Sequence, residues 1–394
     1  AAGLKGKRAA VLTGGRVTTE DAYGYAKFAR IALKTNDIDF RARVSGAEEG
    51  NFLAAKIAGT FDVHYSDIDA ADQVLLVAFE PEEESPIVFL RLNKNFKKRG
   101  LKVTSIATKG SIAMDKLKAD FIKVAPGAEA AAVAGVALTA KSVILVGERA
   151  SESAGLISAA VALAEKTGAK LAWIPRRAGE RGALEAGAFP TLLPGGRPVA
   201  DSAARVDVAA AWGVDSLPAT PGRTTHQIIE ALGNGELDSV VVGGVDAHDL
   251  LHSRKVLDVL KNSFVVSLEI ATSSVTEVAD VVLPVAAVTE KSGSFLNWEG
   301  RARAFDAAVS ESLNRSDVRI LSALADAMGE SIMLGTVSAT AREFAQLGKW
   351  DGARVPFAPV AAGSAPAASG DQAILTSWRR LLDMGTMQRG EDNL

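Results

Sequence analysis

Short apolar runs alternate with amphipathic stretches along the chain, and this alternation predicts the class of fold. The run QVLLVAF at 73–79 is apolar through its centre and bounded by turn-forming residues, as is SVVV at 239–242. Strands that are buried on both faces of a parallel sheet have this pattern. Further strands are expected at 8–13, 36–39, 101–106, 121–124, 142–146, 171–174 and 264–268.

Helices are predicted between these strands, where apolar residues recur at helical spacing and capping residues are present. Thr18 or Thr19 can cap a helix whose first turn carries Glu20 and Asp21, which suit the helix dipole. Gly100 ends another helix as a C′ glycine. Strands that alternate with helices predict an α/β fold. The remaining helices are expected at 85–99, from 128 onward, and at 155–166, 226–232, 249–261, 316–328 and 339–347.

Three segments indicate how the chain is organised. Residues 142–174 predict a strand–turn–helix–strand unit, which is one half of a doubly wound sheet. Residues 176–222 are rich in Gly, Pro and Arg and predict a long irregular segment, of the kind that is usually functional or an interface. Residues 351–370 predict a linker, and 378–387 begin something helical, so we expect the middle of a longer polypeptide.

The composition narrows the class of protein. The chain has 394 residues, 48% of them hydrophobic, which suits two or three globular domains. Its formal net charge of −3 argues against nucleic acid as the main partner. No apolar run is long enough to cross a bilayer, so no direct membrane insertion is expected. Because cysteine is absent, these residues cannot form disulfides, cysteine-ligated zinc sites, iron–sulfur clusters or cysteine nucleophiles.

Two local features could bind ions, and each also has a plain structural explanation. His248 and His252 have the spacing of helical metal ligands, with Asp246 or Asp249 as the nearest third ligand. Surface positions near the start of a helix explain them without a metal. The glycine pair at 14–15 could cradle an anion, but without the GxGxxG spacing or a Walker lysine a tight strand–helix turn is the preferred interpretation.

The stretch at 279–303 carries a dense group of polar side chains. Val281 to Leu283 predict a short buried strand that stops at Pro284. A loop after a strand is where α/β sheets place ligand sites, although an ordinary turn has the same composition. No nucleophile elbow, HExxH pair or complete phosphate-binding fingerprint is present, so no catalytic machinery is visible. The polar run contains Glu290, Lys291, Ser292, Gly293, Ser294, Asn297, Glu299, Gly300 and Arg301.

Four segments resemble, in the same order, segments of the molybdopterin oxidoreductases. EKSGSFLNWEGR at 290–301 is similar to the family signature E-x-x-G-T-x-x-N-x-E-G-R, with Ser294 in place of threonine. The other three lie at 31–44, 71–88 and 239–249. The resemblance implies a formate dehydrogenase/DMSO reductase-like fold of two interlocked α/β domains with mainly parallel sheets. The expected domains are 1–140 and 141–312, followed by helices at 313–348 that return to the first domain and a linker with the start of a further segment at 349–394.

The departures from the family pattern fall at positions that hold its cofactor. The place of the metal-ligating Cys or selenocysteine corresponds to Ser45, followed by Glu48 and Glu49, whose charges would repel an anionic cofactor. The two Gly-x-Asn-Pro turns are Ala78-Phe79-Glu80-Pro81 and Gly244-Val245-Asp246-Ala247. We therefore expect a vestigial pocket with no bound cofactor, no catalytic residue and no metal ligand. Its members would be Ser45, Glu80, Gly244, Asp246, Glu290, Gly293, Asn297 and Arg301.

A scaffold with altered cofactor turns resembles the large iron–sulfur subunits (the G subunits) of NADH:quinone oxidoreductase, respiratory complex I, of the actinobacterial type. The resemblance implies a structural, non-catalytic segment in the peripheral arm of this proton-translocating enzyme. The 2Fe–2S and 4Fe–4S clusters would lie upstream in the full chain. Expected partners are the NADH-binding flavin subunit and the quinone-site subunits, at the cytoplasmic face of the plasma membrane.

Two alternatives remain open at this point. The first is an active molybdopterin-dependent oxidoreductase, similar to formate dehydrogenase or nitrate reductase, with Ser45 or no residue as protein ligand to the metal. The second is a stand-alone binding or assembly protein that uses the cleft for another ligand.

Overall fold

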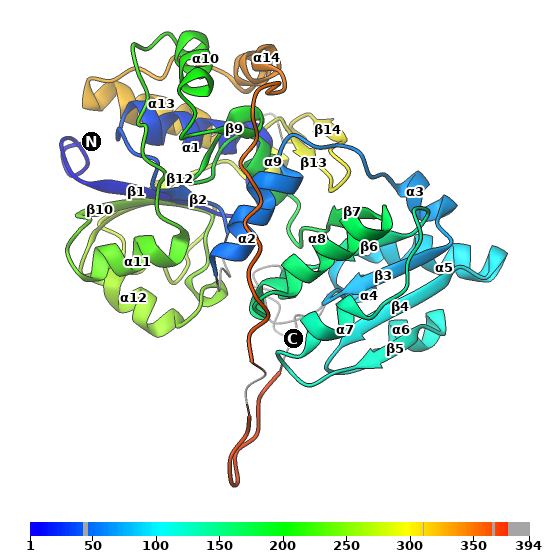
Figure 1. Cartoon of the computed structure of the whole chain (residues 1–394). Helices are drawn as coiled ribbons and strands as arrows, with labels where there is room; N and C mark the ends of the chain where they lie inside the picture. Colours follow the sequence, from blue (N-terminus) through cyan, green and yellow to red (C-terminus); the bar gives the residue numbers. More distant parts are fainter. Residues whose placement is uncertain (42–45, 310, 365–366, 377–394) are drawn as a thin grey trace. The chain divides into compact units, whose positions relative to one another are not determined.

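The computed structural model describes residues 1–41, 46–309, 311–364 and 367–376, which form two compact units (Figure 1). Unit 1 contains the described residues within Ala1–Val44, Leu53–Gly59 and Arg177–Pro356. Unit 2 contains those within Ser45–Phe52, Thr60–Arg176 and Phe357–Leu394. Because the chain passes between the units several times, the prediction of two interlocked α/β domains is confirmed.

Unit 1 is built on a parallel five-stranded sheet with the order β12-β11-β10-β1-β2. The two central strands β1 and β10 pair in register, from Ala9 opposite Ser239 to Thr13 opposite Gly243. All residues of both strands are buried, as their apolar patterns predict. The strands are β1 (Ala9–Thr13), β2 (Ile38–Asp39), β10 (Ser239–Gly243), β11 (Phe264–Glu269) and β12 (Val281–Pro284).

Strand β12 lies at the edge of this sheet and pairs with β11 alone. Its residues Val281 and Val282 are 38% and 43% exposed, so the prediction of a buried strand here is wrong. β-branched residues favour an extended backbone at an edge as well as in the centre of a sheet, and the apolar pattern alone does not distinguish the two positions.

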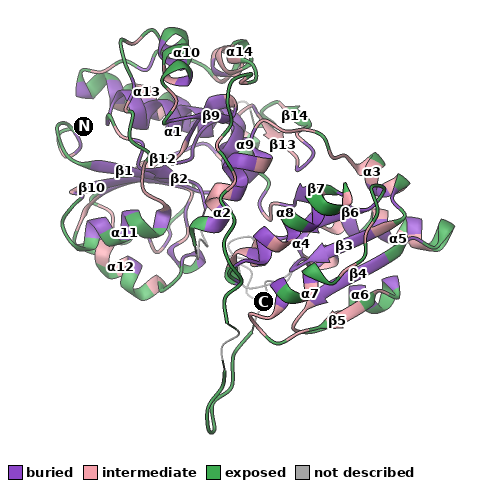
Figure 2. Ribbon diagram, viewed as in Figure 1, coloured by how far each residue is buried: buried purple, intermediate pink, exposed green. Residues whose placement is uncertain are grey.

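Helices cover both faces of the unit 1 sheet (Figure 1). On one face, α11 (Thr225–Gly233) and α12 (Ser253–Lys261) form a core with apolar side chains of β1, β10 and β11. On the other face lies α1 (Thr19–Ile31), against which α13 (Asp317–Met328) and α14 (Val337–Leu347) pack. Figure 2 shows α1 buried along its length, and all of its residues are in fact buried.

Helix α1 is buried although it carries several charged side chains. Arg30 donates hydrogen bonds to the carbonyl oxygens of Gly187, Phe189 and Leu192, and its burial lowers the pKa of the guanidinium to about 9. These bonds connect α1 to a segment more than 150 residues away in sequence. The charges of α1 therefore have internal partners, as buried charges require.

The segment at 176–222 is more regular than predicted. It contains α9 (Glu180–Glu185), the short hairpin β8 (Leu192–Leu193) and β9 (Arg197–Pro198), the 3₁₀ turn η3 (Pro194–Gly196) and α10 (Ser202–Trp212). Asp201 caps α10 by accepting hydrogen bonds from the amides of Ala203 and Ala204. The prediction of an irregular segment is therefore wrong for these residues. α9, the hairpin and η3 are too short to give a clear periodicity, and the alanine-rich sequence of α10 has no strong contrast between apolar and polar positions.

Unit 2 contains a second parallel five-stranded sheet, with the order β5-β4-β3-β6-β7. Its strands are β3 (Gln73–Val77), β4 (Lys102–Ala107), β5 (Asp120–Lys123), β6 (Val143–Val146) and β7 (Lys170–Trp173). Its helices are α2 (Ala47–Phe52), α3 (Tyr65–Ala70), α4 (Pro81–Glu84), α5 (Pro86–Arg99), α6 (Ile112–Leu117), α7 (Glu129–Ala134) and α8 (Leu156–Thr167).

The strand pairing does not support the predicted boundary between residues 140 and 141. β3 pairs with β6, and β1 pairs with β10, so each sheet combines strands from both predicted domains. The run at 142–174 does form the predicted β6–α8–β7 unit, but it completes the sheet of β3 and β4 instead of starting a new one. The correct division after this run falls between Arg176 and Arg177.

Part of the predicted linker is held against unit 2. The amide of Ala358 donates to Oδ1 of Asn51, and that of Val360 donates to the hydroxyl of Ser158. The predicted linker at 351–370 therefore includes a segment that is hydrogen-bonded to unit 2. The predicted helical segment at 378–387 lies outside the described residues. Among the described residues, no helix is long and apolar enough to span a membrane.

Candidate functional site: two acidic turns and the 279–303 loop

The first acidic turn follows β10 in unit 1. Gly244 adopts the left-handed conformation with φ of 63°, and Asp246 two residues later accepts a hydrogen bond from the amide of His248 at 3.0 Å. A Cβ atom on Gly14, at the end of the neighbouring strand β1, would lie 2.0 Å from the carbonyl oxygen of Gly244. The turns after β1 and β10 therefore touch each other through backbone atoms, which agrees with the prediction of a tight turn at Gly14.

The space at these strand ends is filled by the protein's own side chains. The cavity there has a volume of about 10 Å³, close to the minimum that one water molecule needs. Arg16 and Arg177 each lie 3.6 Å from Oδ2 of Asp249, and Arg177 also pairs with Glu180 at 2.9 Å. Within unit 1 these residues fit a phosphate-bearing dinucleotide poorly, because the cavity they line is small and its positive groups already have partners.

The second acidic turn follows β3 in unit 2 and has the same backbone plan. Ala78 is left-handed with φ of 47°, and Glu80 two residues later is 5% exposed. Glu80 accepts a hydrogen bond from the Ser111 hydroxyl at 2.9 Å, and its own amide donates to Oε1 of Glu84. Burial raises the pKa of Glu80 to about 7, and Arg149 pairs with Glu84 at 3.0 Å.

A left-handed alanine is unusual, because its Cβ clashes with the backbone in this conformation at a cost of roughly 1–2 kcal/mol. The equivalent position in unit 1 is Gly244, which has no such penalty. The two turns thus share one conformation, and the alanine occupies a place that suits glycine. The origin of both turns from glycine-containing cofactor turns stays a prediction, to which this backbone conformation adds a position that favours glycine.

The carboxylate of Glu48 lies at the N-terminus of α8 within unit 2. It accepts hydrogen bonds from the amide of Gly155 at 2.9 Å, and from the amide and hydroxyl of Ser158, each at 2.7 Å. Three donors and the helix dipole compensate its charge. Glu49 is also buried, whereas Ser45 lies outside the described residues.

The 279–303 loop continues from β12 into a small hairpin of β13 (Gly293–Leu296) and β14 (Ala302–Phe305). Oδ1 of Asn297 accepts a hydrogen bond from the amide of Arg301 at 2.8 Å. The amide group of Asn297 and the guanidinium of Arg301 both contact Glu299, each at 3.2 Å. These three signature residues therefore shape the hairpin turn.

Glu290 fixes the start of the same loop. Its carboxylate accepts hydrogen bonds from the amide of Ala287 and the hydroxyl of Ser312, both at 2.8 Å, and from the side chain of Asn314. These bonds lower the pKa of Glu290, with the bond from Ala287 as the largest cause. Gly293 packs against Thr18, where a Cβ atom would lie 2.7 Å from Cγ2 of the threonine.

The loop is attached to α1 by two sets of polar contacts. Ser294, at the threonine position of the signature, donates from its amide and its hydroxyl to Glu20 at 2.8 and 2.7 Å. The ammonium of Lys291 lies 2.6 Å from Asp21 of α1 and 2.9 Å from Asp317 of α13. Each of these contacts lies within unit 1, so they stabilise one unit and are not evidence for a link between the two.

Lys291 and its partners form a buried charge cluster that sequence reasoning missed. Burial alone would lower the pKa of Lys291, but the two carboxylates outweigh it and raise the pKa. Burial, together with the neighbouring Asp21, raises the pKa of Asp317. Tyr25 donates to Asp317 at 2.9 Å. The helix dipole alone explains an acidic first turn of α1, and nothing local in the sequence indicates that Asp21 pairs with a lysine 270 residues away.

The histidines do not form a metal site with the neighbouring acids. His248 lies in the 3₁₀ turn η4 (Ala247–Asp249), with Nδ1 3.1 Å from Asp246, and His252 immediately precedes α12. Within 1–41, 46–309, 311–364 and 367–376, no group of three or more His, Cys, Asp or Glu side chains is arranged to hold a metal ion.

Comparison with known proteins places this geometry in a family context. The family model for molybdopterin oxidoreductase matches residues 4–327. The G subunit of NADH-quinone oxidoreductase from Mycobacterium tuberculosis is 51% identical over 400 residues, which cover 98% of this chain and 50% of that protein. The protein of the same name from Streptomyces coelicolor is 47% identical over 426 residues, with the same two coverages of 98% and 50%.

A more distant relative has a different activity in its name. The F420-dependent formate dehydrogenase subunit alpha of Methanocaldococcus jannaschii is 26% identical over 362 residues, which cover 75% of this chain and 53% of that protein. The chain spans about half the length of the Mycobacterium and Streptomyces relatives.

Proposed function

This chain belongs to the molybdopterin oxidoreductase family, and on that premise we propose that it is a cofactor-free part of the G subunit of an NADH-quinone oxidoreductase. The two relatives of that name match 98% of the chain at 47–51% identity. In this role the chain serves as a structural domain of the enzyme's peripheral arm and takes no part in the chemistry itself.

The observation that carries the proposal is the filled, acidic strand end of unit 1. A cofactor of this family would bring phosphates to the turn of Gly244 and Asp246, where the cavity measures about 10 Å³. Asp246 presents a carboxylate to that space, and the arginines beside it are already paired with Asp249. Uncompensated like charges in such a place cost several kcal/mol, on the order of a broken buried ion pair.

The remaining parts of the proposal concern the longer protein. The 2Fe–2S and 4Fe–4S clusters belong to the portion of the G subunit that this chain does not cover. The partners are the NADH-binding flavin subunit and the quinone-site subunits. The complex lies at the cytoplasmic face of the plasma membrane, with this chain as a peripheral part.

The residues assigned to the vestigial pocket have local structural roles, each within its own unit. Gly244 provides the left-handed turn after β10, while Glu290, Gly293, Asn297 and Arg301 maintain the loop and its hairpin. Glu80 and Ser111 close the corresponding turn of unit 2. The alternative of an active molybdopterin enzyme rests on a weaker likeness, since the F420-dependent formate dehydrogenase subunit is 26% identical over 75% of the chain, against 47–51% over 98% for the two G subunits.

Purification of the tagged full-length protein from membranes tests this proposal. The chain should fractionate with NADH:quinone activity, and deletion of the segment corresponding to residues 1–348 should abolish assembly of the active complex. If the tagged protein separates from this activity and reduces nitrate or oxidises formate on its own, the proposal is wrong.

A further inference from the structure

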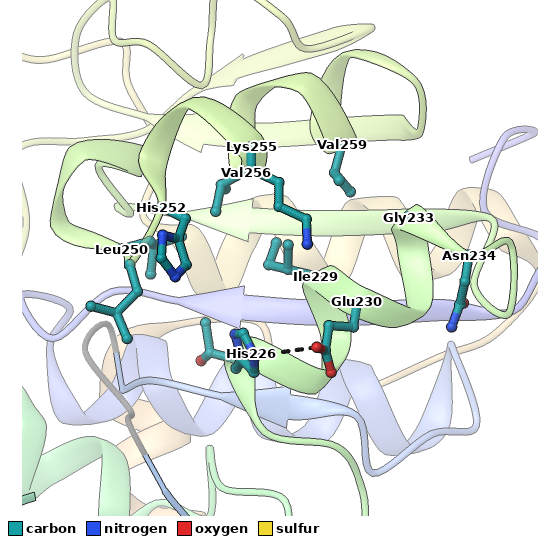
Figure 3. Close-up of a pocket in the computed structure, with 12 residues that line it drawn as sticks. His226, Ile229, Glu230, Gly233, Asn234, Leu250, His252, Lys255, Val256 and Val259 are labelled. Atoms are coloured by element: carbon teal, nitrogen blue, oxygen red, sulfur yellow. Dashed lines mark ion pairs between the residues drawn. The ribbon is translucent and has the colours of Figure 1, made fainter. Parts of the chain in front are cut away.

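A groove runs between α11 and α12 on the outer side of unit 1 (Figure 3). Its volume is about 540 Å³, which lies within the range of roughly 300–1,000 Å³ typical of binding pockets. The two helices approach each other closely at one point, where a Cβ atom on Gly233 would lie 3.2 Å from Cγ2 of Val259. The groove is therefore formed by the packing of these two helices. Its volume is much larger than the roughly 10 Å³ of the cavity at the strand ends.

The floor of the groove is apolar. Ile229 of α11 and Val256 of α12 are 6% and 4% exposed and belong to the core of unit 1, together with Leu250. Leu251 beside them is 46% exposed and adds an unburied apolar side chain at the edge. Apolar side chains of a ligand would therefore find partners between the two helices.

The polar side chains lie on the rim. His226, His252 and Lys255 are exposed, and Figure 3 shows Lys255 reaching from α12 toward α11 above Ile229. His226 pairs with Glu230 at 3.3 Å, whereas the side chains of His252 and Lys255 have no hydrogen-bond or ion-pair partner in the part of the chain that the structure describes. The groove thus offers an apolar floor beside an unpaired cation.

Building on the proposed function, we infer that this groove binds an acidic amphipathic segment of a partner subunit. The charge of Lys255 is complementary to a carboxylate on such a segment, and the floor is complementary to its apolar side chains. The lining residues of α11 extend from Thr225 to Gly233, and those on the other side from His252, which precedes α12, to Val259 within it, about two helical turns each. Two parallel ridges of this length accept a short helix of another protein.

A protein segment fits this groove better than a small molecule does. Small-molecule pockets place a few polar groups among the apolar walls to fix the ligand's orientation. Here the one buried polar side chain is Thr225, and its hydroxyl already donates to the carbonyl oxygen of Arg41 at 2.7 Å. The other polar groups are exposed on the rim, where a partner protein supplies matching side chains of its own.

Zero-length carbodiimide cross-linking of the intact complex tests the inference, because the reagent joins an amine to a carboxylate only when the two are in contact. Lys255 should couple to an Asp or Glu of a different subunit, identified by peptide mass spectrometry. The ion pairs of Lys116 with Glu82 and of Lys170 with Asp67 should give products within the chain, which confirms that the reagent worked. Lys255→Arg, which keeps the charge but lacks the amine, should abolish the new product.

The possible outcomes separate this inference from the proposed function. Coupling of Lys255 to another subunit supports it, and Lys255→Glu should then reduce the yield of that subunit with the purified complex. If the two control pairs react while Lys255 couples to no protein, or only to a second copy of this chain, the inference is wrong although the proposed function stands. If the chain is absent from the complex, both are wrong.

Discussion

The ammonium of Lys291 lies 2.9 Å from Oδ2 of Asp317. In the sequence the two residues are separated by the β13–β14 hairpin, since Lys291 lies in the loop before it and Asp317 is the first residue of α13 after it. Both side chains are less than a tenth exposed, and Asp21 of α1 completes the cluster. One lysine thus balances two buried carboxylates. This cluster fixes the signature loop to the central helix of unit 1.

Lys291→Met should therefore strongly destabilise the protein. It leaves Asp21 and Asp317 buried without a counter-charge, and loss of one member of a buried pair costs about 3–5 kcal/mol. Urea denaturation followed by circular dichroism measures the change. Lys34→Met is the matched control, because Lys34 is 71% exposed in its pair with Glu330 and its loss should cost less than about 1 kcal/mol. Equal effects of the two substitutions would contradict the assigned role of the cluster.

The buried Glu80 should make stability depend on pH. Burial raises the pKa of this carboxyl from 4.5 to about 7 in the folded protein, so the folded state holds its proton more tightly than the unfolded state does. This contribution is fully present below the unfolded pKa and is lost as the pH rises through the folded pKa. Between about pH 4.5 and 7 the wild type should lose roughly 1–3 kcal/mol relative to Glu80→Gln.

Urea unfolding of both proteins across this pH range provides the measurement. Glu82→Gln removes a carboxylate from α4, the short helix that Glu80 precedes, and serves as the control, since Glu82 is more exposed and pairs with Lys116 at the surface. Its profile should follow that of the wild type. Parallel profiles for Glu80→Gln and the wild type would show that the buried carboxyl does not hold its proton as described.

Glu48 should act as the cap of α8. Replacing it with Gln leaves the three donors with a neutral acceptor in place of a carboxylate. The expected cost is about 1–3 kcal/mol, because hydrogen bonds to a charged group contribute more to stability than those to a neutral one. Thermal unfolding should show a lower midpoint. Asp115→Asn, on an exposed position of α6 in the same unit, should change the midpoint little. A Glu48→Gln midpoint equal to that of the wild type would exclude the capping role.

Substitution by alanine should lower the stability of the protein to different extents at Gly14 and Gly244, which lie close together at the ends of β1 and β10. A Cβ atom at Gly14 would lie 2.0 Å from the carbonyl oxygen of Gly244, so Gly14→Ala forces the strand ends apart and should cost about 3 kcal/mol or more, at the upper end of the usual cost of overpacking, because the clash is with backbone. At Gly244 the nearest atom would be 3.9 Å away, so Gly244→Ala is destabilised only by its left-handed backbone, at a cost of about 1–2 kcal/mol. Similar unfolding midpoints for the two variants would mean that the strand ends are not in close contact.

The sequence predicted most of the regular elements, because their signals are local. Continuous apolar runs marked β1, β3 and β10, and the Gly100 stop marked the end of α5. The domain boundary was wrong because the pairing of β3 with β6 depends on which strands meet in space. A β-turn-α-β run has the same sequence pattern whether it starts a sheet or completes one.

The candidate site was predicted only in part, because its local motifs can be recognised in the sequence whereas contacts between distant residues cannot. The signature identified the loop at 290–301, and the turns of Glu80 and Asp246 were found from their altered residues. The partners of Lys291 were not, because Asp21 also suits the first turn of an isolated helix. Nothing local shows that a carboxylate at Glu48 caps a helix more than 100 residues later in the chain.

The central claim is that this chain holds no molybdopterin cofactor, and the most direct test is the metal and pterin content of the purified, active complex. Inductively coupled plasma mass spectrometry and fluorimetry of oxidised pterins should find no stoichiometric molybdenum, tungsten or pterin while NADH:quinone turnover is intact, both in the wild type and in Asp246→Asn. One molybdenum or tungsten atom with two pterins per chain would contradict the account.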